Sequence, residues 1–204
     1  MPSTRRTLLG ALIPTVALVA GCTARGDAPD TGGTDTDPTV HKPRNPAGDA
    51  VLVDGDANDL VPLRNRVITS AERVAEIGFT DGVPDSTAAK TRTFLETTDY
   101  DTETVFVRHV HTEACRRYRI RSVSWEPGRV EFEYCREYRP PDVACEADRR
   151  DAVALCFRLP DTLEDVSSSG SSGRSPCPDG IDYERIDANA TVSGEPATLP
   201  KSDR

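Results

Sequence analysis

Two alternating segments on either side of a turn signal constrain the fold of this chain most strongly. Residues 118–125 and 130–138 are rich in β-branched and aromatic side chains, and Glu126-Pro127-Gly128 lies between them. This pattern predicts an antiparallel β-hairpin with a charged outer face and an apolar inner face. A three-residue loop would place opposite one another Arg121 and Glu133, Arg117 and Glu137, Ile120 and Tyr134, and Ser122 and Phe132. A register shifted by one residue remains open, because proline is disfavoured at the second central position of a type I turn.

Further strands are expected on both sides of this hairpin. Residues 104–110 are β-branched and aromatic, and residues 152–159 alternate between two faces. Two shorter candidates, residues 51–53 and 66–68, precede them. In the segment 152–159, one face would carry Val153, Leu155, Phe157 and Leu159, and the other Ala154, Cys156 and Arg158.

One or two short helices are expected before the main strands. The segment from Thr69 to Glu72 predicts a capping box with Thr69 as the N-cap, and Gly78 is placed to end this helix. A second helix is predicted from Pro84 to about Thr97, with a thin apolar stripe. The expected fold class is therefore α+β, a small antiparallel β-sheet domain with one or two short N-terminal helices.

Both ends of the chain are expected to be disordered. Residues 22–49 combine glycine, proline, aspartate and threonine without apolar periodicity, which predicts a disordered tether. Residues 162–204 include the serine- and glycine-rich run 167–173, which predicts a flexible C-terminal tail. The folded, disulfide-bearing domain is accordingly expected over residues 50–161.

Residues 1–21 have the features of an export signal. Arg5 and Arg6 precede the apolar run 8–20, which is shorter than the roughly 20 apolar residues that a membrane-spanning helix needs. The arginine pair resembles a twin-arginine (Tat) signal, and Val19-Ala20-Gly21-Cys22 resembles a lipobox. These resemblances imply a mature protein anchored by a lipid on Cys22 to the extracytoplasmic face of the cell membrane. A plain cleaved secretory signal is the alternative.

The composition is acidic and poor in lysine. The chain has 34 acidic residues against 25 basic ones, and only three of the basic residues are lysine. Removal of residues 1–21 leaves 23 basic and 34 acidic residues, a net charge of -11. At molar salt the Debye length is about 3 Å, so such a carboxylate surplus costs little. The acidic balance argues against nucleic acid as a partner.

This composition is similar to that of proteins from extreme halophiles, although an arginine-rich exported protein of a high-GC bacterium remains the alternative. The order of the core, from the segment 94–100 through the strands to Arg158-Leu159-Pro160, resembles uncharacterised lipoproteins of halophilic archaea. That resemblance implies no known activity.

Five cysteines follow the lipobox, and an exported domain with a modest core is where disulfides are expected. Cys115 and Cys145 both lie at the open end of the hairpin, so we expect them to pair. Cys135 and Cys156 occupy outward positions on strands, so we expect the second bond between them. Cys177 would then be left over.

His109 and His111 are the candidate metal ligands. They lie two residues apart and share one face of a strand, an arrangement that suits zinc or copper. No third ligand can be named from the sequence, so two polar residues at a strand end are the favoured interpretation. His41 lies in the tether and is expected to be solvated.

The remaining polar motifs are ambiguous. Arginines at positions 116, 117, 119 and 121 would suit an anion-binding strip, but pairing with Glu133 and Glu137 is favoured. Asn189-Ala190-Thr191 matches an N-glycosylation sequon.

The sequence contains no nucleophile elbow and no phosphate-binding glycine loop. We therefore expect a non-catalytic interaction or structural module without a cofactor, with the membrane and a surface protein as its partners. The alternative is a metal-binding surface lipoprotein that uses His109 and His111 for copper or zinc.

Overall fold

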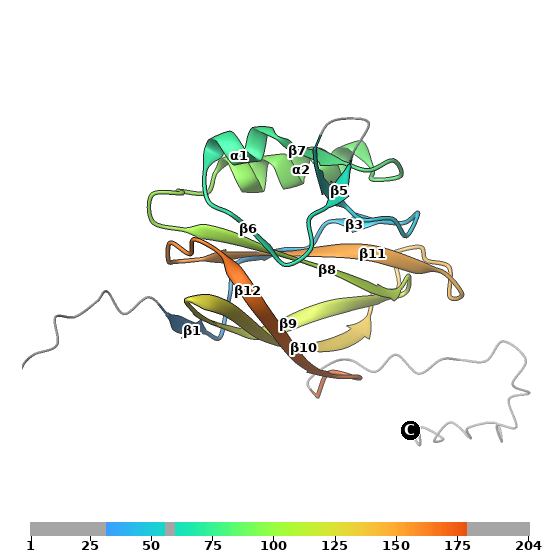
Figure 1. The fold of residues 1–204 in the computed structure, drawn as a ribbon. Helices are drawn as coiled ribbons and strands as arrows, with labels where there is room; N and C mark the ends of the chain where they lie inside the picture. Colours follow the sequence, from blue (N-terminus) through green and yellow to red (C-terminus); the bar gives the residue numbers. More distant parts are fainter. Residues whose placement is uncertain (1–31, 56–59, 179–204) are drawn as a thin grey trace, which may run out of the picture. The chain divides into compact units, whose positions relative to one another are not determined.

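The computed structural model describes residues 32–55 and 60–178 (Figure 1). These residues form a mostly β structure of several sheets with two short helices. Neither described helix has the length and apolar character that a bilayer crossing requires. The predicted features at Arg5, Arg6, Cys22 and Asn189 lie outside the described residues.

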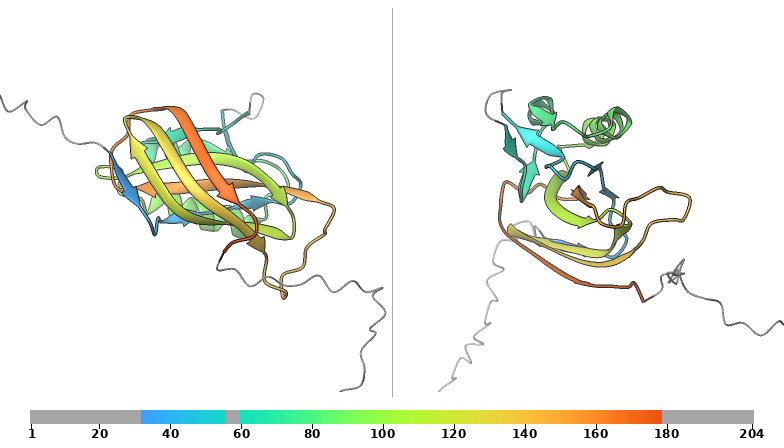
Figure 2. Two further views of the ribbon diagram at one scale, coloured as in Figure 1. Left: turned by 90° about the horizontal axis from the view of Figure 1, so that it is seen from below. Right: turned by 90° about the vertical axis from the view of Figure 1, so that its right-hand side faces the viewer.

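The predicted hairpin forms the centre of a four-stranded sheet, here called the hairpin sheet. Its order is β1 (Gly33–Asp35), β9 (Arg116–Glu126), β10 (Gly128–Tyr138) and β12 (Val166–Arg174). These strands lie side by side when the molecule is seen from below (Figure 2). β12 runs parallel to β10. The sheet is therefore mixed, whereas the sequence predicted a purely antiparallel one.

The hairpin has two registers separated by a β-bulge. Close to the turn, Glu133 lies opposite Ser122, which is the register one residue away from the main prediction. Beyond the bulge the register is the one predicted from a three-residue loop, and Glu137 lies opposite Arg117. The predicted position of Arg121 directly opposite Glu133 is wrong, because Arg121 is the additional residue on β9 that the bulge accommodates.

The serine- and glycine-rich segment, predicted to be flexible, forms β12. Its glycines leave room for side chains of β10: a Cβ at Gly173 would overlap the ring of Tyr134, and one at Gly170 would lie 3.0 Å from Glu131 Oε1. Glycine within a strand often marks such a close approach. Backbone pairing with β10, rather than burial of its own side chains, therefore orders this segment.

A second sheet, here called the central sheet, has the order β2 (Val40–His41), β11 (Arg150–Leu159), β8 (Thr104–Glu113) and β6 (Arg66–Ile68). β3 (Arg44–Asn45) also pairs with β11. Together with β1, the short strands β2 and β3 lie in the segment predicted to be a tether. The predicted domain boundary at residue 50 is therefore wrong, because pairing to β9 and β11 orders this segment from Gly33 onward.

The third layer contains a small sheet and both helices. The small sheet has the order β5 (Val61–Pro62), β4 (Leu52–Asp54) and β7 (Ile77–Phe79). α2 (Asp85–Glu96) agrees with the predicted second helix.

The first helix differs from its prediction at both ends. α1 (Ala71–Ala75) is capped by Ser70, whose Oγ accepts a hydrogen bond from the Arg73 amide at 3.2 Å, and not by Thr69. The helix also ends before Ile77, which is buried as the first residue of β7. Ile77 is in a strand and not in the helix because it pairs with Asp54 of β4.

The central sheet separates two hydrophobic cores. Phe157 and Leu155 pack against the hairpin sheet, whereas Ala154 and Cys156 pack into the core that α1, α2 and β4 help to form. Figure 2 shows the central sheet between these two layers. The predicted alternation of β11 is confirmed, but both of its faces are buried, as in a strand at the centre of a layered domain.

Candidate functional site

Two disulfides connect the hairpin sheet to neighbouring segments. Cys115 is bonded to Cys145, the pair expected from the open end of the hairpin, with a Cα–Cα distance of 5.2 Å. Cys135 is bonded to Cys177, with a Cα–Cα distance of 5.0 Å, so the predicted Cys135–Cys156 bond is wrong.

The positions of the two strands explain this correction. Cys156 lies on β11 and faces the core beside the helices, where burial raises the pKa of its thiol to about 12. Cys135 lies on β10, and the parallel pairing of β12 with β10 brings Cys177 close to it. The parallel strand that decides the pairing was not predicted from the sequence.

The two histidines on β8 make backbone contacts. Nε2 of His109 accepts a hydrogen bond from the Leu52 amide at 3.4 Å, and burial, assisted by Arg64 and His111, lowers the pKa of His109 to about 4. Nε2 of His111 lies 3.2 Å from the carbonyl oxygen of Gly48, to which it can only donate. In residues 32–55 and 60–178 no group of three or more histidine, cysteine, aspartate or glutamate side chains is arranged to hold a metal ion.

His41 was predicted to be solvated, but its side chain is half-buried. Its ring stacks on Phe94 with a centroid distance of 5.2 Å, and its Nε2 lies 2.9 Å from Thr91 Oγ1. Burial, assisted by the charge of Lys90, lowers the pKa of His41. This histidine therefore connects β2 to α2.

The arginines of β9 make separate contacts. Arg117 Nη2 lies 2.7 Å from Glu137 Oε1, and Arg119 Nη1 lies 3.8 Å from Glu137 Oε2, which agrees with the favoured interpretation. The guanidinium of Arg116 lies over the ring of Tyr138 at 4.4 Å. Arg116, Arg117 and Arg119 thus contact side chains of the neighbouring strand β10.

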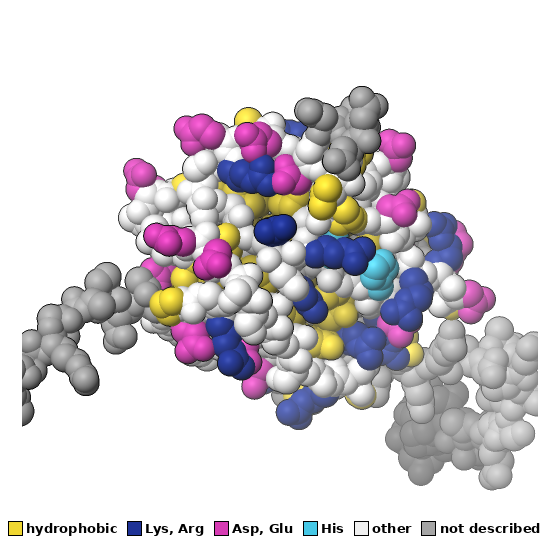
Figure 3. Space-filling model, in the orientation of Figure 1, with side chains coloured by type: hydrophobic (Ala, Val, Ile, Leu, Met, Phe, Trp, Pro, Cys, Tyr) yellow, Lys and Arg dark blue, Asp and Glu magenta, His cyan; other side chains and the backbone are white. Residues whose placement is uncertain are grey.

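Basic side chains are unevenly distributed despite the acidic composition. On the face shown in Figure 3, lysine and arginine side chains gather toward the centre and right, and acidic side chains lie above them, to the left and along the right-hand edge. The overall charge of the chain therefore does not describe the local charge of its surfaces.

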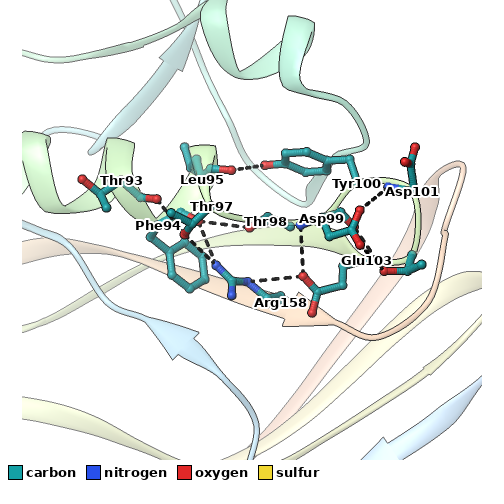
Figure 4. A network of polar contacts seen from close by, with 11 residues as sticks. Thr93, Phe94, Leu95, Thr97, Thr98, Asp99, Tyr100, Asp101, Glu103 and Arg158 are labelled. Atoms are coloured by element: carbon teal, nitrogen blue, oxygen red, sulfur yellow. Dashed lines mark hydrogen bonds and ion pairs between the residues drawn. The ribbon is translucent and has the colours of Figure 1, made fainter.

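Arg158 of β11 joins α2 to the central sheet (Figure 4). Its Nη2 donates to the carbonyl oxygen of Phe94 at 2.9 Å, and its guanidinium lies 4.7 Å from the centroid of the Phe94 ring. Its Nε lies 3.7 Å from Glu103 Oε2. The hydroxyl of Tyr100 donates to the carbonyl of Leu95 at 3.0 Å, and burial raises the pKa of Tyr100 to about 12. These contacts satisfy carbonyl groups at the C-terminal end of α2, so we assign the network a structural role.

A different set of arginines meets at the open end of the hairpin. Arg44 lies on β3, Arg139 directly follows β10, and Arg149 directly precedes β11. Arg44 Nη1 lies 2.6 Å from Asp151 Oδ2, and the two side chains are only 17% and 4% exposed. Arg149 Nη1 lies 3.2 Å from Glu146 Oε1 on the surface.

Arg44 and Arg139 converge on one backbone oxygen. Nη1 of each side chain donates to the carbonyl of Ala114 at 3.2 Å. Burial and the neighbouring Arg44 lower the pKa of Arg139. The two guanidinium groups are therefore held close together in a partly buried environment.

These side chains border a cavity of about 440 Å³. We call it the arginine pocket and define it by Arg44, Arg139, Arg149, Glu146 and Asp151. Its remaining walls are mainly apolar and consist of Pro46, Pro84, Thr87, Ala114, Ala144 and Cys145. The pocket was not predicted, because Arg44 is far in the sequence from the other four charged residues and no local pattern in residues 139–151 marks a site.

Comparisons with known proteins add no relative from which a role could be transferred. No family model, curated protein or solved structure matches this chain.

Proposed function

We propose that this chain is a lipid-anchored extracytoplasmic protein whose β domain is a non-catalytic binding or structural module. The two disulfides are the observation that carries this proposal. Disulfides persist in oxidising compartments and are rare where thiols are kept reduced. They agree with the export signal inferred from residues 1–22.

The bonded cysteines also suit a small domain exposed outside the cell. They are separated by 30 and 42 residues in the sequence. Closing loops of this length restricts the unfolded chain, and each bond typically contributes about 2–4 kcal/mol. The two bonds add to the hydrophobic contacts that hold the hairpin sheet against the central sheet.

Chain geometry limits how far the domain can lie from the membrane. Cys22 precedes the first residue of β1, Gly33, by eleven positions. At about 3.3–3.6 Å per extended residue, these positions span at most about 40 Å. A lipid on Cys22 would hold the module close to the membrane surface, where it would meet membrane-bound partners.

The anchor is tested by Cys22→Ser, with Thr23→Ser as the matched control beside it. We expect wild type and Thr23→Ser to fractionate with membranes and to yield an N-terminal peptide that begins at a lipid-modified Cys22. The Cys22→Ser protein should be unprocessed or released, because stable attachment depends on the acyl chains. A Cys22→Ser protein that is cleaved like the wild type and still fractionates with membranes at the wild-type level would contradict the proposal.

The export route is tested by Arg5→Lys/Arg6→Lys. This double variant should accumulate inside the cell, whereas Arg25→Lys, which lies outside the signal, should be exported normally. Normal export of the double variant would show that the twin-arginine interpretation is wrong.

A further inference from the structure

We propose that the arginine pocket binds a small organic acid through its carboxylate group and that Arg139 recognises this charge. The inference rests on the proposed function in one respect, since it assigns a ligand class to the binding module.

The charged groups of the pocket do not balance one another. Three arginines and two carboxylates border it. Arg44 is paired with the buried Asp151, both of whose charges also act on Arg139, and Arg149 is paired with Glu146 at the surface. Arg139 forms no ion pair with a carboxylate among the described residues. The pocket therefore has one cationic group in excess, inside a chain with a net charge of -9.

Arg139 offers more hydrogen-bond donors than the described residues use. A guanidinium has five N–H groups, arranged as a fork that matches a carboxylate with two parallel hydrogen bonds. Within the described residues, the side chain of Arg139 donates only to the carbonyl of Ala114, which it shares with Arg44. An incoming carboxylate would supply acceptors to the remaining donors. It would also offset the repulsion between Arg139 and Arg44.

The cavity has the size and the lining of a small-molecule site. About 440 Å³ lies within the range of small-molecule sites, roughly 300–1,000 Å³. Pro46, Pro84, Ala114 and Ala144 give the pocket apolar walls, which an inorganic anion would leave without contacts. The ligand that fits both features is an acid with an apolar body.

The pocket is preorganised by the surrounding structure. The Cys115–Cys145 bond fixes the loop that carries Ala144 and Glu146. The buried Arg44–Asp151 pair joins β3 to β11 at the base of the cavity. A ligand would meet walls that are already in place, which reduces the entropy lost on binding.

The test uses N-acetyl-L-leucine as the probe, titrated into the full mature chain and followed by calorimetry and by the NMR signals of arginine side chains. We expect saturable binding with a shift of the Arg139 signal. N-acetyl-L-leucinamide has the same body without the charge and should bind about tenfold more weakly or not at all. Inorganic phosphate should not displace the probe.

Two variants act on different parts of the site. Arg139→Gln should weaken probe binding about tenfold, while Arg129→Gln, the same charge change at the far end of β10, should not. Ala144→Trp fills the cavity from an exposed loop position and should abolish binding although every arginine remains. Circular dichroism checks that each variant is folded.

A peptide ending in a free C-terminal leucine, compared with its amidated form, distinguishes the two sources of such a carboxylate. Binding of the peptide without binding of N-acetyl-L-leucine would overturn the small-molecule assignment. Equal binding of acid and amide, equal loss in Arg139→Gln and Arg129→Gln, or no binding at all would also overturn it. Membrane anchoring through Cys22 is measured separately, so a failed titration leaves the proposed location intact.

Discussion

Arg44 and Asp151 form the most buried ion pair in the described part of the chain, with 2.6 Å between Nη1 and Oδ2. The pair joins β3, in a segment without apolar periodicity, to the first residues of β11. Arg44 also donates to the carbonyl oxygens of Ala114 and Arg116, so its guanidinium connects both sheets at the open end of the hairpin.

Asp151→Asn should destabilise the domain by about 3 kcal/mol. The substitution keeps the shape of the side chain but leaves the guanidinium of Arg44 partly buried without a counter-charge, which is costly. The free energy of unfolding in denaturant measures the effect. Glu146→Gln, which removes the partner of the exposed Arg149, is the control and should cost about 0–1 kcal/mol. Equal effects of the two variants would contradict the structural role of the buried pair.

Gly173→Ala should destabilise the domain by about 1–3 kcal/mol, because the added methyl group would overlap the ring of Tyr134. Ser172→Ala, the neighbouring exposed position on β12, should change stability little. The measurement is the midpoint of thermal or denaturant unfolding for both variants. A neutral Gly173→Ala would mean that β12 does not lie against β10 as described.

Peptide mapping without reduction should find Cys115–Cys145 and Cys135–Cys177, with Cys156 as a free thiol. Cys135→Ser/Cys177→Ser should cost about 2–4 kcal/mol, since the bond restricts the unfolded chain. The thiol of Cys156 should react with iodoacetamide only after unfolding, because it is buried and its pKa is raised to about 12. A Cys135–Cys156 peptide would contradict the described strand order.

His109 should make stability depend on pH below neutrality. Its pKa is about 4 in the folded protein, against an ordinary value of 6.5, so the unfolded chain binds more protons between these values. The contribution of neutral His109 to the free energy of unfolding is complete above pH 6.5. It is lost as the pH falls toward 4, by an amount on the order of 2–3 kcal/mol. Denaturant unfolding of wild type and of His109→Gln at several pH values in this range gives the difference between their free energies of unfolding. This difference should become smaller as the pH falls. A constant difference would contradict the lowered pKa.

The purified mature chain is expected to bind neither copper nor zinc stoichiometrically. Metal binding through Nε2 of His109 would break its hydrogen bond with the Leu52 amide, and Nε2 of His111 is directed at the carbonyl of Gly48. Metal analysis of the wild type beside His109→Ala/His111→Ala tests this. Stoichiometric metal that disappears in the double variant would support the alternative function as a metal-binding lipoprotein.

The elements that agree with their predictions are those marked by a local pattern in the sequence. The strand over residues 66–68 and the helix α2 lie where the sequence places them. β9, β10 and β11 agree with their alternation, because a strand with a buried face needs apolar side chains at every second position. The same patterns placed the open end of the hairpin, and with it the Cys115–Cys145 pair.

Local patterns in the sequence are therefore enough to predict the hairpin, the alternating strand β11 and the second helix. The positions of β1, β2, β3 and β12 depend on long-range contacts in the folded chain, since their backbone groups are satisfied by distant strands and not by a pattern of their own. The Cys135–Cys177 bond follows from the parallel position of β12. The arginine pocket depends on long-range pairing in the same way, because Arg44, Arg139 and Arg149 meet only after β3, β10 and β11 have come together.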